Sequence, residues 1–134
     1  MRCVYTALQA TVPMLTVVIR KCYGMAGMGT TDKNGLDLKI AWPSAEWGSL
    51  PVEGGVAAAY RREIAAAPDP ALRVQEIETQ LRKFASPVLT AEAFAVEDVI
   101  DPRDTRTYLC RFINAMQGKL ATSVGPKSKS GVRP

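Results

Sequence analysis

The chain has 134 residues, of which 47% are hydrophobic and 22% are charged. This length limits the protein to one domain, and the apolar content excludes a disordered, highly charged chain because a hydrophobic core can close. The net charge of +4 is unevenly placed, since residues 1–116 carry 13 acidic and 13 basic residues. The excess lies in residues 117–134, which contain Lys119, Lys127, Lys129 and Arg133. Four charges without interleaved aromatic residues favour a surface contact, so we expect no nucleic-acid partner.

The sequence contains no histidine, which removes the commonest general base and metal ligand together with Ser-His and Cys-His nucleophile schemes. Its three cysteines, Cys3, Cys22 and Cys110, lie far apart and match neither a zinc site nor a disulfide framework. This spacing favours a reducing, cytosolic setting. No apolar run approaches the roughly 18 residues of a transmembrane helix, and the N-terminus lacks the features of a signal peptide. We expect neither a bound metal nor a membrane partner.

The first predicted elements are the end of a helix, a buried strand and a glycine-rich turn. Residues 2–10 have apolar side chains at helical spacing, and Pro13 favours an end to that helix. Residues 14–19 form a continuous, largely β-branched apolar run, which predicts a strand buried on both faces. Residues 24–29 contain three glycines, and such a turn between strand and helix can present backbone N–H groups to a ligand.

Two strands and two helices are predicted next. Residues 36–42 alternate in hydrophobicity as a strand does, and residues 45–50 fit a further short strand. Residues 53–67 and 71–85 each carry apolar residues at helical spacing. The Asp-Pro pair at 69–70 matches an N-cap followed by proline in the first turn of the second helix.

The last third of the chain predicts one more strand and one more helix. Residues 88–95 fit one or two helical turns, and residues 96–100 fit a short strand. Asp101 and Pro102 match the N-cap and first turn of a final helix. We expect its buried face to consist of Thr105, Leu109, Phe112, Ile113 and Met116. Residues 117–134 then turn to Lys, Ser, Gly and Pro without aromatic residues, which predicts a basic, mobile tail.

The glycine turn is the strongest candidate for a functional site. Because the sequence offers no nucleophile paired with a base, the backbone N–H groups remain as the groups that could act. Two N–H groups at such a turn can stabilise an oxyanion, and one donor contributes roughly 100- to 1000-fold in rate. The spacing is neither GxGxxG nor a P-loop, which disfavours a nucleotide phosphate. An ordinary tight turn is the alternative for so short a cluster.

Other features have simpler structural explanations. A metal ion could be held by a group of four acids, but two of them match helix caps. This group consists of Glu97, Asp98, Asp101 and Asp104. Trp42 and Trp47 are expected in the core, and Cys22 lacks a base that would make it a nucleophile, so we expect it to pack.

Several segments, in this order and spacing, resemble a known family. They are residues 10–13 (Ala-Thr-Val-Pro), 16–24 (Thr-Val-Val-Ile-Arg-Lys-Cys-Tyr-Gly), 41–46 (Ala-Trp-Pro-Ser-Ala-Glu), 53–56, 60–64, 85–87, 98–106 and 126–131. Together they are similar to the carboxyltransferase (β) subunit of biotin-dependent acyl-CoA carboxylases, the family of propionyl-CoA and methylcrotonyl-CoA carboxylases. This resemblance implies an α/β, crotonase-like fold, a spiral of strand–strand–helix units with outer helices that pack on other subunits. Residues 1–116 would be the C-terminal part of the family's C-terminal domain.

The resemblance also implies a mechanism that needs no histidine. Carboxybiotin, carried on a separate carrier domain, docks with its ureido carbonyl held by backbone N–H groups. A biotin nitrogen takes the α-proton of an acyl-CoA, and the carboxylate is transferred to that carbon. By resemblance, the N–H groups of Met25 and Ala26 form the biotin-side oxyanion hole, Gly24 and Gly27 complete the biotin site, and Met28 occupies the substrate-sensing position.

Substrate and partners follow from the same resemblance. It implies an acyl-CoA substrate, a biotin carboxyl carrier or biotin carboxylase subunit, and other carboxyltransferase subunits, with no biotin attached covalently to this chain. The compartment would be the bacterial cytosol or, in a eukaryote, the mitochondrial matrix. Since the chain matches only the end of the family's second domain, we expect a fragment that is inactive alone. The alternatives are a non-catalytic subunit-assembly fragment and a crotonase-fold decarboxylase or hydratase.

Two departures from the family pattern lie beside the proposed site. Met25 follows Gly24 in a run that is usually Gly-Gly-Ala-Tyr, and a side chain there is compatible with backbone donors only if the backbone angles suit it. Residues 50–52, Leu-Pro-Val, replace a Met-Gly-Ala type of turn, and Pro51 lacks an N–H donor.

Overall fold

A computed structural model describes residues 10, 12–28 and 37–122 of the chain. Apart from residue 10, the helix predicted at the N-terminus lies outside these residues. The described elements are β1 (Leu15–Val18), β2 (Lys21–Tyr23), α2 (Met25–Met28), β3 (Leu38–Ala41), β4 (Glu46–Gly48), α3 (Val52–Ala59), α4 (Arg61–Ala66), α5 (Pro70–Phe84), α6 (Pro87–Glu92), β5 (Asp98–Val99), the 3-10 turn η1 (Pro102–Asp104) and α7 (Thr105–Thr122).

The strands form two parallel sheets, one of order β1-β3-β5 and one of order β2-β4. Leu15 pairs with Leu38 at the start of β1, and Lys21 pairs with Glu46 at the start of β2. Only a short bend joins β1 to β2, and a similar bend joins β3 to β4, so each pair sends one strand to each sheet. A helix follows the second strand of each pair, α2 after β2 and α3 after β4. The predicted strand–strand–helix repetition is therefore confirmed.

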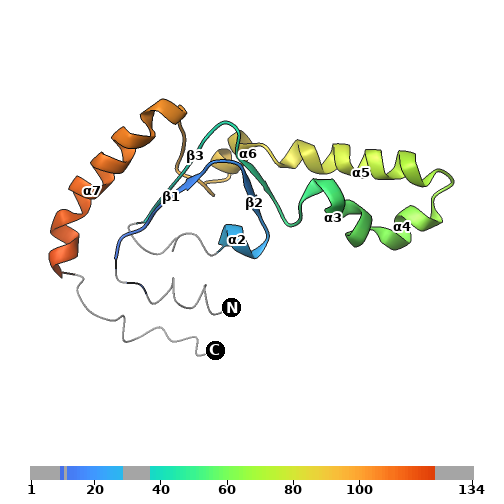
Figure 1. Cartoon of the computed structure of the whole chain (residues 1–134), viewed down its shortest axis with the longest axis horizontal. Coiled ribbons are helices and arrows are strands. Elements are labelled where there is room, and N and C mark those ends of the chain that lie inside the picture. Colours follow the sequence, from blue (N-terminus) through green and yellow to red (C-terminus); the bar gives the residue numbers. More distant parts are fainter. Residues whose placement is uncertain (1–9, 11, 29–36, 123–134) are drawn as a thin grey trace.

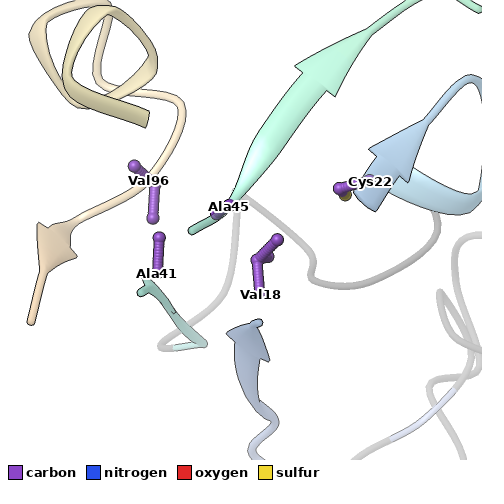
Figure 2. Close-up of a cluster of buried hydrophobic side chains, with 5 residues drawn as sticks. All are labelled: Val18, Cys22, Ala41, Ala45 and Val96. Atoms are coloured by element: carbon purple, nitrogen blue, oxygen red, sulfur yellow. The ribbon is translucent and has the colours of Figure 1, made fainter. Parts of the chain in front are cut away.

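The core is small and lies where the two sheets meet. It consists of Val18, Cys22, Ala41, Ala45 and Val96, which Figure 2 shows coming from β1, β2, β3 and the loops before β4 and β5. Alanine at two of these positions lets the strand ends approach closely, and both alanines are at most 1% exposed. Trp47, Ala91 and Val99 pack against this cluster and are partly buried. Trp47 therefore belongs to the core's edge, as predicted.

Burial of β1 differs from the prediction for residues 14–19. Within the described residues, only Val18 of this strand is fully buried, while the three before it are half-buried. Ile19, just after the strand, is 52% exposed. Figure 1 shows the reason: α7 extends to one side of the sheets and α3, α4 and α5 extend to the other, so the described helices do not form a layer over both faces.

The single helix predicted for residues 53–67 is wrong, because the chain forms α3 and α4 with two breaks. Glu53 and Gly54 have non-helical backbone angles, with φ of +78° at Gly54, and Tyr60 separates the two helices with φ of −103° and ψ of 20°. The helix predicted over residues 71–85 is confirmed as α5. The Asp69 carboxylate accepts hydrogen bonds from the amides of Ala71 and Leu72, as an N-cap does.

The final helix starts as predicted but is not buried as predicted. The Asp101 carboxylate accepts a 2.8 Å hydrogen bond from the Arg103 amide and caps η1, which leads into α7. Among the described residues of α7 none is fully buried, and Ile113 on the expected face is 54% exposed. The helix also continues through Gly118 to Thr122, so the predicted start of the tail at 117 is wrong. The remainder, 123–134, lies outside the described residues, and its mobility stays a prediction.

No described helix combines the length and the apolar character needed to cross a membrane.

The end of α6 contains a strained residue. The Phe94 amide donates to the Ala91 carbonyl (2.9 Å) and the Ala95 amide donates to the Thr90 carbonyl (3.0 Å), the two bonds of a Schellman motif. This motif needs a left-handed residue, usually glycine, and Phe94 has φ of +53° there. Its ring is 88% exposed, so no burial offsets the strain.

We predict that Phe94→Gly raises the free energy of unfolding by about 1 kcal/mol, because it removes the Cβ that opposes the left-handed conformation. Equilibrium urea unfolding of the full chain measures this. Phe94→Ala is the matched control, since it removes the exposed ring but keeps the Cβ, and it should stabilise less. Equal effects of the two substitutions would contradict the strain.

Candidate functional site

The predicted glycine turn joins β2 to α2 at a position whose backbone conformation favours glycine. Gly24 has φ of +57°, and its amide donates a 3.0 Å hydrogen bond to the Gly48 carbonyl at the end of β4. A Cβ on Gly24 would lie 3.4 Å from the carbonyl oxygen of Ser49. The turn is therefore fixed by its backbone angle and by the neighbouring strand.

A second glycine lets α2 lie directly on β2. A Cβ on Gly27 would lie 3.1 Å from the Cys22 Sγ and 3.5 Å from the Cys22 carbonyl oxygen, so a larger residue would push α2 outward. The Gly27 amide also donates to the Gly24 carbonyl (3.1 Å). Cys22 itself is 6% exposed and packs in the core, which confirms the predicted packing role.

The amides of Met25 and Ala26 are the first two of α2. The hydrogen-bond pattern of a helix provides no carbonyl for the amides of its first turn, so these two can be offered to a ligand. Phe94 is the one described non-glycine residue with positive φ, so the Met25 backbone accepts a side chain without strain. The Met25 side chain is 53% exposed. The departure at position 25 is thus compatible with a backbone site, whereas the side chains of Ala26 and Met28 lie outside what the structure describes.

Lys39 belongs to the same region and was not predicted from the sequence. Its Nζ donates a 3.0 Å hydrogen bond to the Gly27 carbonyl, although Lys39 lies on β3, well away from the turn in sequence. The residue is only 7% exposed. The available signal was a lysine between Leu38 and Ile40 in an apolar strand, but the strand pattern alone does not say which segment covers that face.

Tyr23 ties β2 to β4 on the other side of the turn. Its hydroxyl donates a 2.8 Å hydrogen bond to the Glu46 carboxylate. Burial, together with the hydrogen bond and negative charge of Glu46, raises the pKa of Tyr23 to about 12. The ring packs so closely on Gly48 that a Cβ there would lie 3.0 Å from Tyr23 Cε1. The protonated phenol is therefore a structural donor at neutral pH.

An exposed ion cluster lies beside α3. Lys21 Nζ is 3.0 Å from a Glu53 oxygen, and an Arg82 nitrogen is 3.6 Å from the other. The hydrogen bond from Lys21, followed by its charge and that of Arg82, lowers the pKa of Glu53. Both cations and the carboxylate are well exposed, so solvent screening limits their contribution to stability. Pro51, the other departure, is the N-cap residue of α3 with φ of −60°.

Three of the four acidic candidates have structural partners. Glu97 accepts a hydrogen bond from the Lys39 amide, Asp98 accepts one from the Tyr108 hydroxyl, and Asp101 caps η1. In the part of the chain that the structure describes, no three His, Cys, Asp or Glu side chains converge as metal ligands. The Trp42 indole Nε1 donates to the Thr105 hydroxyl (2.9 Å) and so joins β3 to α7.

Two parallel sheets linked by strand–strand–helix units define a crotonase-like α/β fold, here a partial domain. The chain belongs to the carboxyl transferase domain family, whose model matches residues 1–130.

Two relatives of the chain are named as acyl-CoA carboxyltransferase subunits. The chain is 39% identical over 129 residues to the methylmalonyl-CoA carboxyltransferase 12S subunit of Propionibacterium freudenreichii subsp. shermanii, covering 95% of this chain and 24% of that protein. It is also 39% identical over 129 residues to the propionyl-CoA carboxylase carboxyltransferase subunit of Haloferax mediterranei, covering 95% of this chain and 25% of that protein. The chain therefore spans about a quarter of the length of these relatives.

Solved structures agree with the fold. A transcarboxylase 12S structure with methylmalonyl-coenzyme A and methylmalonic acid bound superposes with a TM-score of 0.74 at 34% identity, covering 99% of this chain and 26% of that one. The β subunit of geranyl-CoA carboxylase from P. aeruginosa also has a TM-score of 0.74, over 98% of this chain and 26% of that one. Because its sequence identity is only 18%, the second comparison supports the fold and nothing further.

We predict that Gly24→Ala lowers the free energy of unfolding by roughly 1–2 kcal/mol, because alanine is strained at this positive φ. Gly118→Ala is the matched control. Gly118 lies in the last turns of α7 with open space around it, so there the same change should stabilise by up to about 1 kcal/mol. Urea unfolding measures the free energy of unfolding of both variants. If Gly24→Ala is as stable as Gly118→Ala, or more stable, the fixed turn is contradicted.

The raised pKa of Tyr23 predicts a loss of stability at high pH. The folded chain holds this proton to about pH 12 while an unfolded tyrosine releases it near 10, so the contribution is full below pH 10 and is lost as pH rises toward 12. Unfolding free energies measured from pH 8 to 12 should fall more steeply for the wild type than for Tyr23→Phe. Parallel curves would show that the phenol does not hold its proton in the fold.

Proposed function

We propose that this chain provides the biotin side of a carboxyltransferase that moves a carboxylate between carboxybiotin and the α-carbon of an acyl-CoA. The observation that carries this proposal is the Gly24–Gly27 turn, which brings two first-turn amides to the start of α2 within a carboxyl transferase fold. In the proposed site the amides of Met25 and Ala26 donate to the ureido oxygen, and Gly24 and Gly27 hold those amides in place.

The described turn fits a ureido group. The group has a planar carbonyl whose oxygen takes up negative charge, and two adjacent N–H donors suit that oxygen. When bound, carboxybiotin would supply the carboxylate and a ring nitrogen that takes the α-proton, so the chain needs no side-chain base. The task of its residues is to orient the ureido oxygen and stabilise its charge, and one donor of this kind contributes roughly 100- to 1000-fold in rate.

The acyl-CoA and the partners are part of the same proposal. The relatives are named for methylmalonyl-CoA and propionyl-CoA, and the 12S transcarboxylase is described as a hexamer that binds substrate in a multienzyme core. By analogy we propose a short acyl-CoA, a biotin carboxyl carrier or biotin carboxylase subunit and further carboxyltransferase subunits as partners, in the cytosol. Met28 is proposed to contact the acyl group.

A second candidate function, decarboxylation of an acyl-CoA, is supported by one relative. The chain is 35% identical over 117 residues to the methylmalonyl-CoA decarboxylase subunit α of Propionigenium modestum. Biotin, with its ureido oxygen held by the same amides, would then accept the carboxylate from the acyl-CoA. Later release of CO₂ from carboxybiotin would make the net reaction a decarboxylation. Both readings place the ureido oxygen at Met25 and Ala26, so both fail if those amides are not used.

A chimera tests the proposal. The matching quarter of the Propionibacterium 12S subunit is replaced by this chain, and transfer of carboxylate from labelled methylmalonyl-CoA to free biotin is measured. We expect transfer by the chimera and roughly a 100-fold or greater loss in Met25→Pro, because proline suits the first helical position but lacks the N–H.

Met25→Ala is the matched control, since it changes the exposed side chain and keeps the donor, and its rate should stay near that of the unaltered chimera. A hexameric chimera without transfer, or equal rates for the proline and alanine variants, would contradict the proposed site.

A further inference from the structure

Lys39 is a charged residue at a buried position, although the alternating pattern of its strand predicts an exposed one. It lies in the middle of β3, where Ile40 and Ala41 are both fully buried, and it is itself only 7% exposed. Lysine is rarely buried to this extent because moving an ammonium group out of water is costly. The residue therefore needs an explanation that packing does not supply.

Within the described residues, pairing with a carboxylate is not that explanation. Among residues 10, 12–28 and 37–122, no acidic side chain lies within ion-pair distance of Lys39 Nζ. The neighbouring Glu97 carboxylate accepts its 2.6 Å hydrogen bond from the Lys39 backbone amide instead. Within the described residues the ammonium donates to a neutral group, the Gly27 carbonyl (3.0 Å), which compensates for desolvation less than a carboxylate does.

The bond to Gly27 completes a three-point attachment of α2. The β4 strand holds Gly24 through its amide, β2 supports Gly27 through close contact with Cys22, and β3 holds the Gly27 carbonyl through Lys39. Since α2 has only four residues, it has too few internal hydrogen bonds to fix its own direction. Its orientation, and that of its first amides, depends on these three contacts.

We propose that Lys39 is a positioning residue for the amides of Met25 and Ala26. Its ammonium fixes the far end of α2 and places a buried positive charge behind the two donors, which favours negative charge on an oxygen bound to them. This role rests on the proposed function, since it presumes that an oxygen of biotin binds there. Lys39 touches neither the oxygen nor the acyl group and acts through Gly27.

The test uses the full chain, labelled with 15N, with biotin as the probe. In the wild type we expect the amide signals of Met25 and Ala26 to shift with added biotin and not with diaminobiotin, which lacks the ureido carbonyl. Lys39→Met fills the same volume without charge, and it should weaken the biotin response on the order of tenfold while the thermal midpoint stays equal or rises.

Lys39→Arg should restore part of the response, because it keeps a cation and a donor. Lys83→Met is the control for loss of a lysine, since Lys83 is exposed on α5, and it should respond as the wild type does. In the chimera, Lys39→Met should lower kcat on the order of tenfold and leave KM for the acyl-CoA unchanged.

Any of the following outcomes would contradict the positioning role of Lys39. If Lys39→Met leaves both the biotin response and the turnover of the chimera unchanged, Lys39 has only a packing role. A Lys39→Met chain that loses stability and response together, without rescue by arginine, would make it a structural residue only. If the wild type itself shows neither biotin shifts nor transfer in the chimera, the proposed function fails first, and the positioning role falls with it.

Discussion

The meeting of two strand ends at Gly24 and Gly48 is the constraint on which the rest of the site depends. One hydrogen bond from the Gly24 amide to the Gly48 carbonyl ends the pairing of β2 with β4 and starts α2. It requires a positive φ at Gly24 and room for the Tyr23 ring against Gly48. Because two strand–strand–helix units contribute to it, this contact couples the position of the turn to the packing of the whole core.

Local chemistry explains which elements the sequence could predict. The caps at Asp69 and Asp101 depend on a side chain and amides two or three residues away, so an Asp-Pro pair is enough to locate them. The strand at 15–18 follows from a run of β-branched residues. The breaks at Gly54 and Tyr60 were missed because apolar spacing continues across them, and spacing does not report backbone angles.

Burial was harder to predict than secondary structure, because it depends on what lies opposite. The apolar residues of α7 have the spacing of a buried face, yet Leu109 and Ile113 remain exposed among the described residues. The outer face of β1 shows the same discrepancy. A periodic pattern identifies the side of an element that can be buried, and the presence of a covering layer is a separate fact that only the three-dimensional arrangement supplies. Lys39 is the converse case, since its contact with Gly27 comes from a distant strand.

A site built from main-chain amides leaves a faint trace in a sequence. Such a site requires a particular backbone conformation, and two glycines are the visible sign of it in the sequence. Gly24 is needed for its positive φ, and Gly27 is needed for its close contact with Cys22. In the proposed site Met25 donates through its amide, and its side chain is exposed on a backbone without strain. If the proposed site is correct, methionine in place of glycine at this position alters the rim of the site and leaves the donor in place. Under the proposed function, the residues that hold α2 in place matter more than the side chains of α2, which is why we propose a role for Lys39 on another strand.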